Sequence, residues 1–336
     1  MRANARRLRQ YGLPLGLFVV LYVGLLLPAM SPVASAYAIL DNLTVLGLAT
    51  LGVAFCMIAR EIDLSVGSTV AVSGLLAIKL SAFGAPTSIL LTTIIAGAYG
   101  AFQGFLIHRL RIDSIVLTLG TLILLRGVAY LFTDSALRLD DPADGDVFLT
   151  RVGGVFTVAS IIAVVAYLVL GGVLRYTKPG REVYAFGGAR SEAIAAGVNG
   201  RRVLITVFCV SGLCAGLAGS VSAYQSASAN PTSYGDLLFA VFSAALLGGV
   251  SLKGGRGSAI NVFLGVGVMG CITAAFSIRG SSYYEAQLTT GVILFAVVTI
   301  DWLLARRWAS ALARRRLELR HTWSGDSSTT SGRLTI

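Results

Sequence analysis

The chain has 336 residues, of which 27 are Lys or Arg and 16 are Asp or Glu, so only 13% are charged while 55% are hydrophobic. Soluble domains carry about 25% charged residues, and so little charge cannot cover the surface of a soluble protein of this length. The composition therefore excludes an ordinary soluble enzyme, a disordered protein and a disulfide-linked scaffold. It predicts an all-α integral membrane protein with about ten transmembrane helices.

Ten apolar runs approach the roughly 20 residues that a helix needs to cross the hydrocarbon layer. The eighth run is short and rich in glycine, so we expect it to be broken or only partly embedded. A basic segment, 1–12, precedes the ten-span region 13–305, and a basic tail, 306–336, follows it. The predicted spans are 13–30, 40–59, 64–83, 88–107, 115–133, 153–174, 203–223, 237–252, 259–278 and 287–305.

The distribution of charge predicts the direction of the spans, because Lys and Arg beside a span stay in the cytoplasm. With the amino terminus inside, the basic connections at 60, 109–111, 175–202 and 253–256 all lie inside, as does the tail. The outer connection 134–152 carries five Asp and only two Arg. Both termini are therefore expected in the cytoplasm. The net charge of +11 is explained by these flanking residues, and no nucleic-acid partner is expected.

Two features of the topology leave alternatives open. The Arg-rich residues 2–9, an apolar stretch and Ala34-Ser35-Ala36 together resemble a cleavable signal peptide. The apolar stretch is longer than usual for such a peptide, and the charge alternation needs this span, so we favour a retained helix. Five spans lie in each half, so structural repeats would have to be inverted relative to each other, as in many transporters.

No cofactor or metal site is expected. Neither His108 nor His321 has a nearby partner that would complete a metal site. None of the three lysines follows a glycine, so the phosphate-binding loop of ATPases is absent. The cysteines lie in apolar runs without a CxxC pair, as is typical of small buried side chains: Cys56, Cys209, Cys214 and Cys271.

Glycines repeat at helical spacing in several apolar runs. Gly265, Gly267 and Gly270 formally match the dinucleotide-binding pattern GxGxxG, but the match lies within an apolar run with no preceding strand. Small residues at this spacing let membrane helices approach closely. We therefore interpret these glycines, and the pairs Gly100/Gly104 and Gly212/Gly216, as helix-packing positions.

Charged residues within membrane spans are costly and often functional. Arg126 is the one clear charge inside a run, and we expect it to contact a neighbouring helix or reach the interface rather than bind solute. The carboxylates fall at predicted span ends, where they are easily solvated, which argues against a proton-driven transporter. They are Asp41, Glu61, Asp63, Asp113, Asp236, Glu285 and Asp301. The outer connection 134–152 is the acidic loop of this chain, and its residues 140–145 lack the ligand pattern of a calcium site.

The inner connection 175–202 is too long for a tight turn. Residues 191–196 predict a short helix that ends at Gly197, a usual C-terminal glycine. A short helix flanked by basic residues on an inner loop has the form of a docking element for a cytoplasmic partner. A plain helix at the membrane interface is the alternative.

Five stretches carry a family resemblance: Ile62–Ser68 (IDLSVGS), Thr118–Gly127, Gly180–Val198, Asn230–Thr232 and Leu247–Ser258. In this order they resemble the permease subunits of bacterial ABC importers of the ribose, xylose and galactose type, in the family of branched-chain amino acid and sugar translocators. The motif residues that match are Asp63, Gly67, Gly120, Arg126, Gly248, Gly249, Gly254 and Gly255. The candidate residues of the coupling loop that this resemblance implies are Gly180, Arg181, Tyr184, Ala185, Gly188, Glu192 and Gly197.

The resemblance implies a permease, not an enzyme, in the bacterial inner membrane. It implies three protein partners: a cytoplasmic ATPase subunit, a periplasmic solute-binding protein and a second permease copy. It further implies that the helix near 189–197 docks into a groove of the ATPase. Nucleotide-driven closure of the ATPases would then alternate access to a central path.

The sequence departs from the family pattern at several positions. Arg60 and Glu61 replace a usual Gly pair, and we expect them to form a local ion pair. The stretch 237–242 is more apolar than usual, which leaves the solute open. The other replacements are Gln103 and Ala189 for Asn, Asp113 for Pro and Val250 for Thr.

A neutral sugar or sugar-like solute fits the scarcity of charge along the spans. Polar residues near span ends are the candidates for the path: Ser65, Gln103, Thr118, Gln225 and Asn230. Two alternatives stay open, namely a self-contained ion-coupled secondary transporter, and an ABC permease for another solute such as a polyol, inositol or autoinducer-2.

Overall fold

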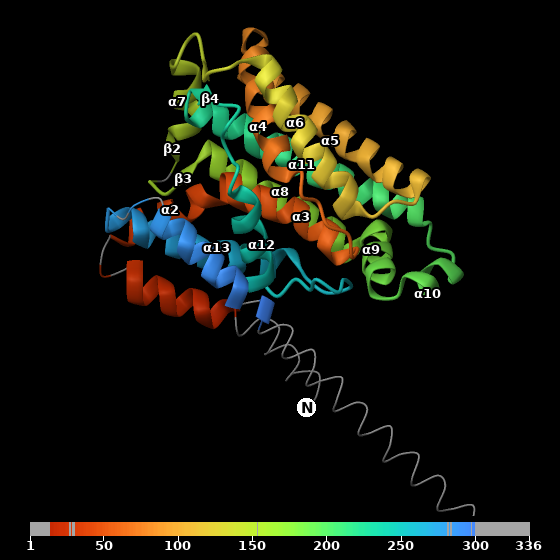
Figure 1. Ribbon diagram of the computed structural model, residues 1–336. Coiled ribbons are helices and arrows are strands. Elements are labelled where there is room, and N and C mark those ends of the chain that lie inside the picture. The colour runs from red at the N-terminus through yellow and green to blue at the C-terminus, as the bar shows by residue number, and fades with distance from the viewer. Residues whose placement is uncertain are drawn as a thin grey trace, which may run out of the picture. The chain divides into compact units, whose positions relative to one another are not determined.

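The computed structural model describes residues 14–26, 28, 31–152, 154–280, 282, 284–296 and 298–299. The basic segment 1–12, residues 297 and 300–305 of the predicted tenth span and the tail 306–336 lie outside the described residues. The chain forms two units, Met1–Gly291 and Val292–Ile336, and the structure below is that of the first. Helices dominate it (Figure 1).

Most of the helices lie within predicted spans. Those in the amino-terminal part are α2 (Pro32–Asn42), α3 (Leu48–Ile58), α4 (Val66–Lys79), α5 (Ala85–Leu110), α6 (Ser114–Phe132) and α7 (Ala143–Leu149). They continue as α8 (Val158–Tyr176), α9 (Lys178–Gly188), α10 (Arg190–Ala195), α11 (Gly200–Gln225), α12 (Leu237–Leu247) and α13 (Ala259–Ile278). In contrast, α7, α9 and α10 lie in the predicted connections 134–152 and 175–202. Two π-helical turns, Tyr22–Leu26 and Leu43–Gly47, and a 3₁₀ turn, Ser81–Phe83, also occur, and the described residues 14–21 and 284–296 are helical as well.

Six helices among the described residues are long and apolar enough to cross a membrane: Val33–Ile58 (α2 to α3), α5, α6, α8, α11 and α13. Pro14–Gly24, α4 and α12 are apolar but shorter. The all-α membrane class is therefore confirmed, while the count of ten spans stays a prediction. The eighth predicted span is short, as expected, because α12 has only 11 residues.

Side chains at the helix ends satisfy backbone groups that would otherwise be unpaired. Asp113 precedes α6, and its carboxylate accepts a hydrogen bond from the amide of Ile115 at 2.8 Å. Thr157 and Ser160 form a reciprocal capping box at the start of α8. The replacement of the usual Pro by Asp113 thus still supports a helix start at this position.

Helices α5 and α11 pack through the glycines that the sequence singled out. A Cβ atom at Gly100 would overlap the carbonyl of Phe208, and one at Gly104 would overlap the carbonyl of Leu204. Likewise, a Cβ at Gly212 would overlap the carbonyl of Ala96. The predicted packing role is confirmed, and the two glycine pairs serve one and the same interface. Gly265 of α13 similarly lies against the backbone of α12 at Ala244 and Gly248.

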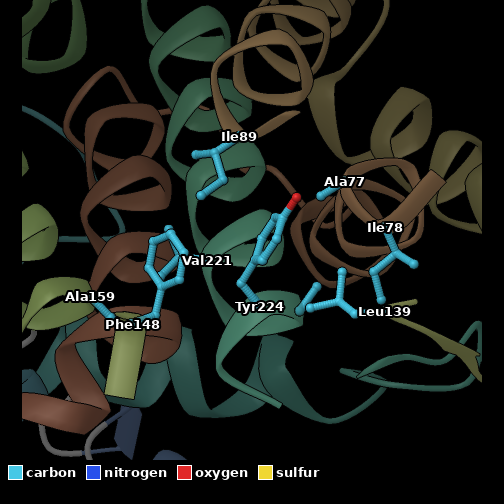
Figure 2. Packing of buried hydrophobic residues seen from close by; sticks show 9 residues of the cluster. Ala77, Ile78, Ile89, Leu139, Phe148, Ala159, Val221 and Tyr224 are labelled. Atoms are coloured by element: carbon cyan, nitrogen blue, oxygen red, sulfur yellow. The ribbon is translucent and has the colours of Figure 1, made fainter. Parts of the chain in front are cut away.

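The predicted outer connections gather at one end of the bundle (Figure 1). Strand β1 (Leu137–Arg138) pairs antiparallel with β4 (Ser228–Ala229), and β2 (Arg151–Val152) pairs with β3 (Phe156–Thr157). Tyr224, fully buried, lies among apolar side chains from α4, α5, α7 and the β1 loop (Figure 2). Through this cluster, the acidic loop packs against the end of α11.

The predicted inner connections gather at the opposite end, where α9 and α10 lie (Figure 1). The backbone amide of Gly255 donates to the carbonyl of Ile58 at 2.7 Å, which joins two of these connections. Arg201 lies over the ring of Phe105 at 5.3 Å, which joins the start of α11 to the end of α5. These contacts place the basic connections at the same end of the bundle, as the charge pattern predicts.

Helices α4 and α12 begin beside each other, and the first turn of α4 is buried within the bundle. A Cβ at Gly67, in the first turn of α4, would lie 2.6 Å from the carbonyl oxygen of Tyr234, shortly before α12 begins at Leu237. At 1.5 Å per residue, α4 spans about 21 Å and α12 about 17 Å, less than the hydrocarbon thickness of about 30 Å. Both are therefore half-helices, and they occupy corresponding positions in the two predicted halves.

Candidate functional site

We name the two ends of the bundle inner and outer after the predicted connections that each holds. Three segments that are distant in sequence meet at the inner end: residues 58–61 at the end of α3, 186–190 where α9 meets α10, and the loop 254–257. We call this region the junction. Gly254 and Gly255 adopt φ of +76° and +69°, a left-handed backbone that favours glycine. A Cβ at Gly187 would overlap the carbonyl of Ile58, so backbone lies directly against backbone. This contact explains Gly187 of the stretch Gly180–Val198 and Gly254 and Gly255 of the stretch Leu247–Ser258.

Tyr184 of the predicted coupling loop binds the junction directly. Its hydroxyl donates to the carbonyl of Gly257 at 2.7 Å. Gly180 lies so close to the end of α8 that a Cβ would overlap the carbonyl of Leu174. These two motif residues therefore fix α9 against the membrane helices, while Arg181, Ala185 and Gly188 are exposed.

An ion pair links the coupling loop to the segment before α4. The guanidinium of Arg190 donates to a carboxylate oxygen of Glu61 at 3.1 Å, and Arg190 also lies over the ring of Phe186 at 4.5 Å. The expected local pair between Arg60 and Glu61 is wrong. Arg60 has φ of +65° and packs against Gly254, so the partner of Glu61 comes instead from α10.

The Glu61 carboxylate is almost fully buried, with a side chain 6% exposed, whereas the side chain of Arg190 is 51% exposed. Burial raises the pKa of Glu61, and hydrogen bonding by Ser114 and the charge of Arg190 partly oppose this shift. The ion pair therefore connects an exposed side chain of α10, Arg190, to a buried carboxylate, Glu61.

Helix α10 presents most of its surface to solvent. Only Ala193 of its residues is buried, and Glu192 is exposed and accepts a hydrogen bond from Ser191 at 2.8 Å, which lowers the pKa of Glu192. The helix ends at Gly197, whose φ is +89° and whose amide donates to the carbonyl of Ile194. The predicted short helix and its terminating glycine are confirmed. The preceding helix α9 was not predicted.

A buried polar network surrounds Asp63 at the start of α4. Its carboxylate accepts hydrogen bonds from the hydroxyls of Ser65 at 2.7 Å and of Ser211 at 2.6 Å. Ser211 lies near the middle of α11, and Asp63 is 3% exposed. The expectation of a solvated carboxylate at a span end is therefore wrong for Asp63, because the half-helix α4 starts within the bundle.

Three of the five path candidates belong to this network. The side-chain amide of Gln103 donates to Ser65 at 3.1 Å and to Thr121 at 2.7 Å, and Thr121 donates in turn to the carbonyl of Thr118. All three candidates, Ser65, Gln103 and Thr118, are buried, so they line no open passage in this conformation.

The other two path candidates lie at the outer end. The side-chain amide of Gln225 donates to Asp41 at 3.2 Å, and Asn230 lines a cavity beside α4 and α11. The five candidates thus form two groups, one within the bundle and one at its outer end.

Arg126 anchors the loop that precedes α12. Its guanidinium donates to the carbonyls of Pro231 at 2.6 Å and Ser233 at 3.0 Å. The expectation of a contact with a neighbouring helix or the interface is therefore corrected, because Arg126 binds loop backbone. The other family-like glycines differ in their surroundings. A Cβ at Gly248 would overlap Asn261, Gly249 has φ of +80°, and Gly120 has no neighbouring atom within 4 Å of such a Cβ.

Sequence reasoning missed several of these residues. Ser211 and Ser222 lie inside a predicted apolar span. Serines are common where membrane helices pack, so their presence alone does not indicate a functional site. Tyr234 has φ of +63°, unusual for a residue other than glycine, and no sequence pattern indicates it. Three of the four cysteines are buried and Cys209 is half-buried, and all are free, as expected. Within the described residues no cluster of metal-ligating side chains occurs.

Comparison with protein families identifies the chain's relatives. The family described as "Branched-chain amino acid transport system / permease component" matches residues 35–300. The chain belongs to this family. Its members are transport components, so this chain is a permease and not an enzyme.

Curated relatives are similar over most of their length. The ribose import permease protein of Escherichia coli strain K12 is 29% identical over 84% of this chain and 90% of its own. The L-arabinose ABC transporter permease protein of Azospirillum brasilense is 32% identical over 84% of each chain. The D-allose transport system permease protein of Escherichia coli strain K12 is 29% identical over 76% of this chain and 79% of its own. No solved structure matches the chain.

Proposed function

We propose that this permease is the membrane-spanning subunit of an ABC importer and forms the path for a sugar or a sugar-like neutral solute. The observation that carries the proposal is the similarity, over most of the chain, to relatives named as ribose, L-arabinose and D-allose permeases. The described helices support it, since they hold few charges and bury a hydroxyl-rich network between α4, α5, α6 and α11.

Three partners belong to the proposal. A cytoplasmic ATPase subunit would bind α10, and a periplasmic binding protein would deliver the solute. A second permease copy would complete the path. The exposed surface of α10 supports the first partner, because a helix that buries only Ala193 leaves its other side chains available for contact. The ion pair between Arg190 and Glu61 connects α10 to the junction, so a movement of the ATPase could displace the membrane helices through it.

Purification from native membranes tests the assembly. We expect an ATPase subunit to be recovered with the permease, and we expect the reconstituted complex to hydrolyse ATP when binding protein and sugar are added. The variant Gly197→Val places a β-branched residue at a left-handed position and distorts the end of α10. It should separate ATP hydrolysis from uptake. The matched variant Gly172→Val, at an open position in α8, should not.

A self-contained ion-coupled transporter is the competing function. The buried carboxylate of Asp63 is the feature that would serve it, but both of its oxygens are held by hydroxyls within the network. Uptake by the purified chain alone, driven by an ion gradient and independent of ATP, would establish this function and overturn the importer proposal.

A further inference from the structure

A cavity of about 380 Å³ lies at the outer end of the permease. Its walls come from α4, from the last turns of α11, from β4 and from the loop that leads to α12. No charged side chain lines it, and polar residues contribute much of its surface, including Ser222, Ser226, Ser228, Asn230, Ser233 and Tyr234. Small-molecule sites typically occupy about 300–1,000 Å³, so the cavity is large enough for a solute of several carbons.

The walls of the cavity are held in place on three sides. Strand β4 pairs with β1 of the acidic loop. The guanidinium of Arg126 holds the carbonyls of Pro231 and Ser233. The hydroxyls of Tyr234 and Ser222 form a hydrogen bond of 2.7 Å across the cavity wall. Because these three restraints converge on one short loop, the cavity has a defined shape.

Several polar groups on the wall are satisfied within the chain. The hydroxyl of Ser226 donates to backbone carbonyls at 2.8 and 2.9 Å, and the Oδ1 atom of Asn230 accepts two hydrogen bonds from Thr232. In contrast, the hydroxyls of Ser228 and Ser233 and the side-chain NH₂ of Asn230 have no partner among the described residues. Three groups therefore remain able to bond something in the cavity.

Resting on the proposed importer function, we propose that this cavity is a binding site for a neutral polyhydroxylated solute. Ser228 and Ser233 both donate and accept hydrogen bonds, and Asn230 donates, which suits the hydroxyl groups of a sugar or polyol. No charged side chain of the described residues lines the cavity, and the guanidinium of nearby Arg126 is held by the carbonyls of Pro231 and Ser233. This disfavours phosphorylated or ionic solutes, because an ion would lose its hydration there without gaining a free counter-charge.

Saturation-transfer NMR on the purified full-length chain in nanodiscs tests the site, because it detects weak binding without the other subunits. The probes are D-ribose, L-arabinose and D-allose, with D-ribose 5-phosphate as the charged comparison. We expect transfer to at least one neutral sugar and none to the phosphate. No transfer to any of the three sugars, or equal transfer to the phosphate, would overturn the proposal.

Variants locate the binding. Ser233→Ala and Ser228→Ala remove hydroxyls that make no internal hydrogen bond, so the fold should be unchanged while the dissociation constant rises about twofold to tenfold. Ser233→Leu should abolish the transfer by filling the cavity. Ser135→Ala, at an exposed position of the acidic loop that does not line the cavity, is the matched control. Unchanged transfer in Ser233→Leu would overturn the proposal.

The two proposals fail in different ways. A chain that binds sugar at this cavity but recovers no ATPase would overturn the importer function and leave the binding site standing. An importer that takes up sugar at the wild-type rate with Ser233→Leu would retain its function and lose the site.

Discussion

At the scale of single residues, the structure depends on places where backbones touch. Gly100, Gly104 and Gly212 each exclude a Cβ because a carbonyl of the facing helix occupies that space. Without a strong hydrophobic force between helices in lipid, such close packing supplies much of the attraction between them. The spacing of these glycines predicts the contact, but which helix faces which follows only from the fold.

Replacement of Gly100 by Ala should destabilise the protein. The added Cβ meets the Phe208 carbonyl, which cannot move aside without shifting α11, and overpacking of this kind costs about 1–3 kcal/mol. Gly172→Ala is the matched control, because nothing lies within 4 Å of its Cβ and alanine favours the helix. Thermal unfolding in detergent measures both. A Gly100→Ala melting temperature equal to that of the control would contradict the packing interpretation.

Arg126→Met should loosen the loop before α12. The substitution preserves the length of the side chain and removes both hydrogen bonds to the carbonyls of Pro231 and Ser233. Hydrogen bonds to charged groups contribute about 1.5–3 kcal/mol, so we expect a lower melting temperature and faster proteolysis within 226–236. Arg138→Met, at an exposed position of β1, should change neither measurement. Equal behaviour of the two variants would argue against the anchoring role.

Single residues also show the limit of prediction from sequence. The position of Asp63 at a predicted span end indicated a solvated carboxylate, yet α4 starts inside the bundle and buries it. The partner of Glu61 was expected next to it and instead comes from Arg190, 129 residues later in the chain. Spacing along the chain reveals local contacts, whereas these partners depend on how half-helices and loops fold back.

At the scale of elements, the junction joins α3, α9 and the loop 254–257 through backbone contacts and one ion pair. The Glu61–Arg190 pair is the connection between the exposed helix α10 and the segment that leads to α4.

Reversal of this ion pair should reveal its role. Glu61→Lys places a cation beside Arg190 and should lower uptake several-fold per ATP hydrolysed, while the double variant Glu61→Lys/Arg190→Glu restores an attractive pair and should recover most of it. Uptake and ATP hydrolysis measured on the same reconstituted complex give the ratio. If the double variant is no better than the single ones, the two residues do not act through each other.

The same pair predicts a dependence on pH. Protonation of Glu61 removes the attraction, and because burial raises its pKa, the loss comes at a higher pH than for an exposed Glu, whose pKa is about 4.3. Acidification should therefore lower coupling but not unfold the chain through this group, since a raised folded-state pKa favours the folded state as pH falls. Glu61→Gln should flatten the pH profile of coupling. A profile identical to that of the wild type would contradict this assignment.

At the scale of the whole molecule, the basic connections meet at one end and the acidic loop lies at the other. The charge pattern predicted this grouping, and the contacts of Arg201 with Phe105 and of Gly255 with Ile58 agree with it. Composition and apolar length were sufficient for the class of protein. They were insufficient for α4, because an apolar run of ordinary composition does not show that its helix begins inside the bundle.

Cysteine labelling in intact cells should fix the orientation of the permease. Ser135→Cys, in the acidic loop, should react with a membrane-impermeant maleimide, whereas Ser191→Cys, in α10, should react only after the membrane is opened. Both positions are exposed. The parent chain is the control, because three of its four cysteines are buried and Cys209 is half-buried. Labelling of Ser191→Cys in intact cells would reverse the predicted topology.

The glycine contact between α5 and α11 has a mechanical consequence. Each helix has 26 residues and is about 39 Å long, and neither can slide or rotate alone without driving a Cβ into a carbonyl. We therefore expect the two helices to move together as one rigid unit. Residues 196–199 connect α10 to the beginning of α11, and Ser222, which lines the cavity, lies near the end of α11. A displacement of α10 that tilts this pair of helices would then change the shape of the cavity at their opposite end.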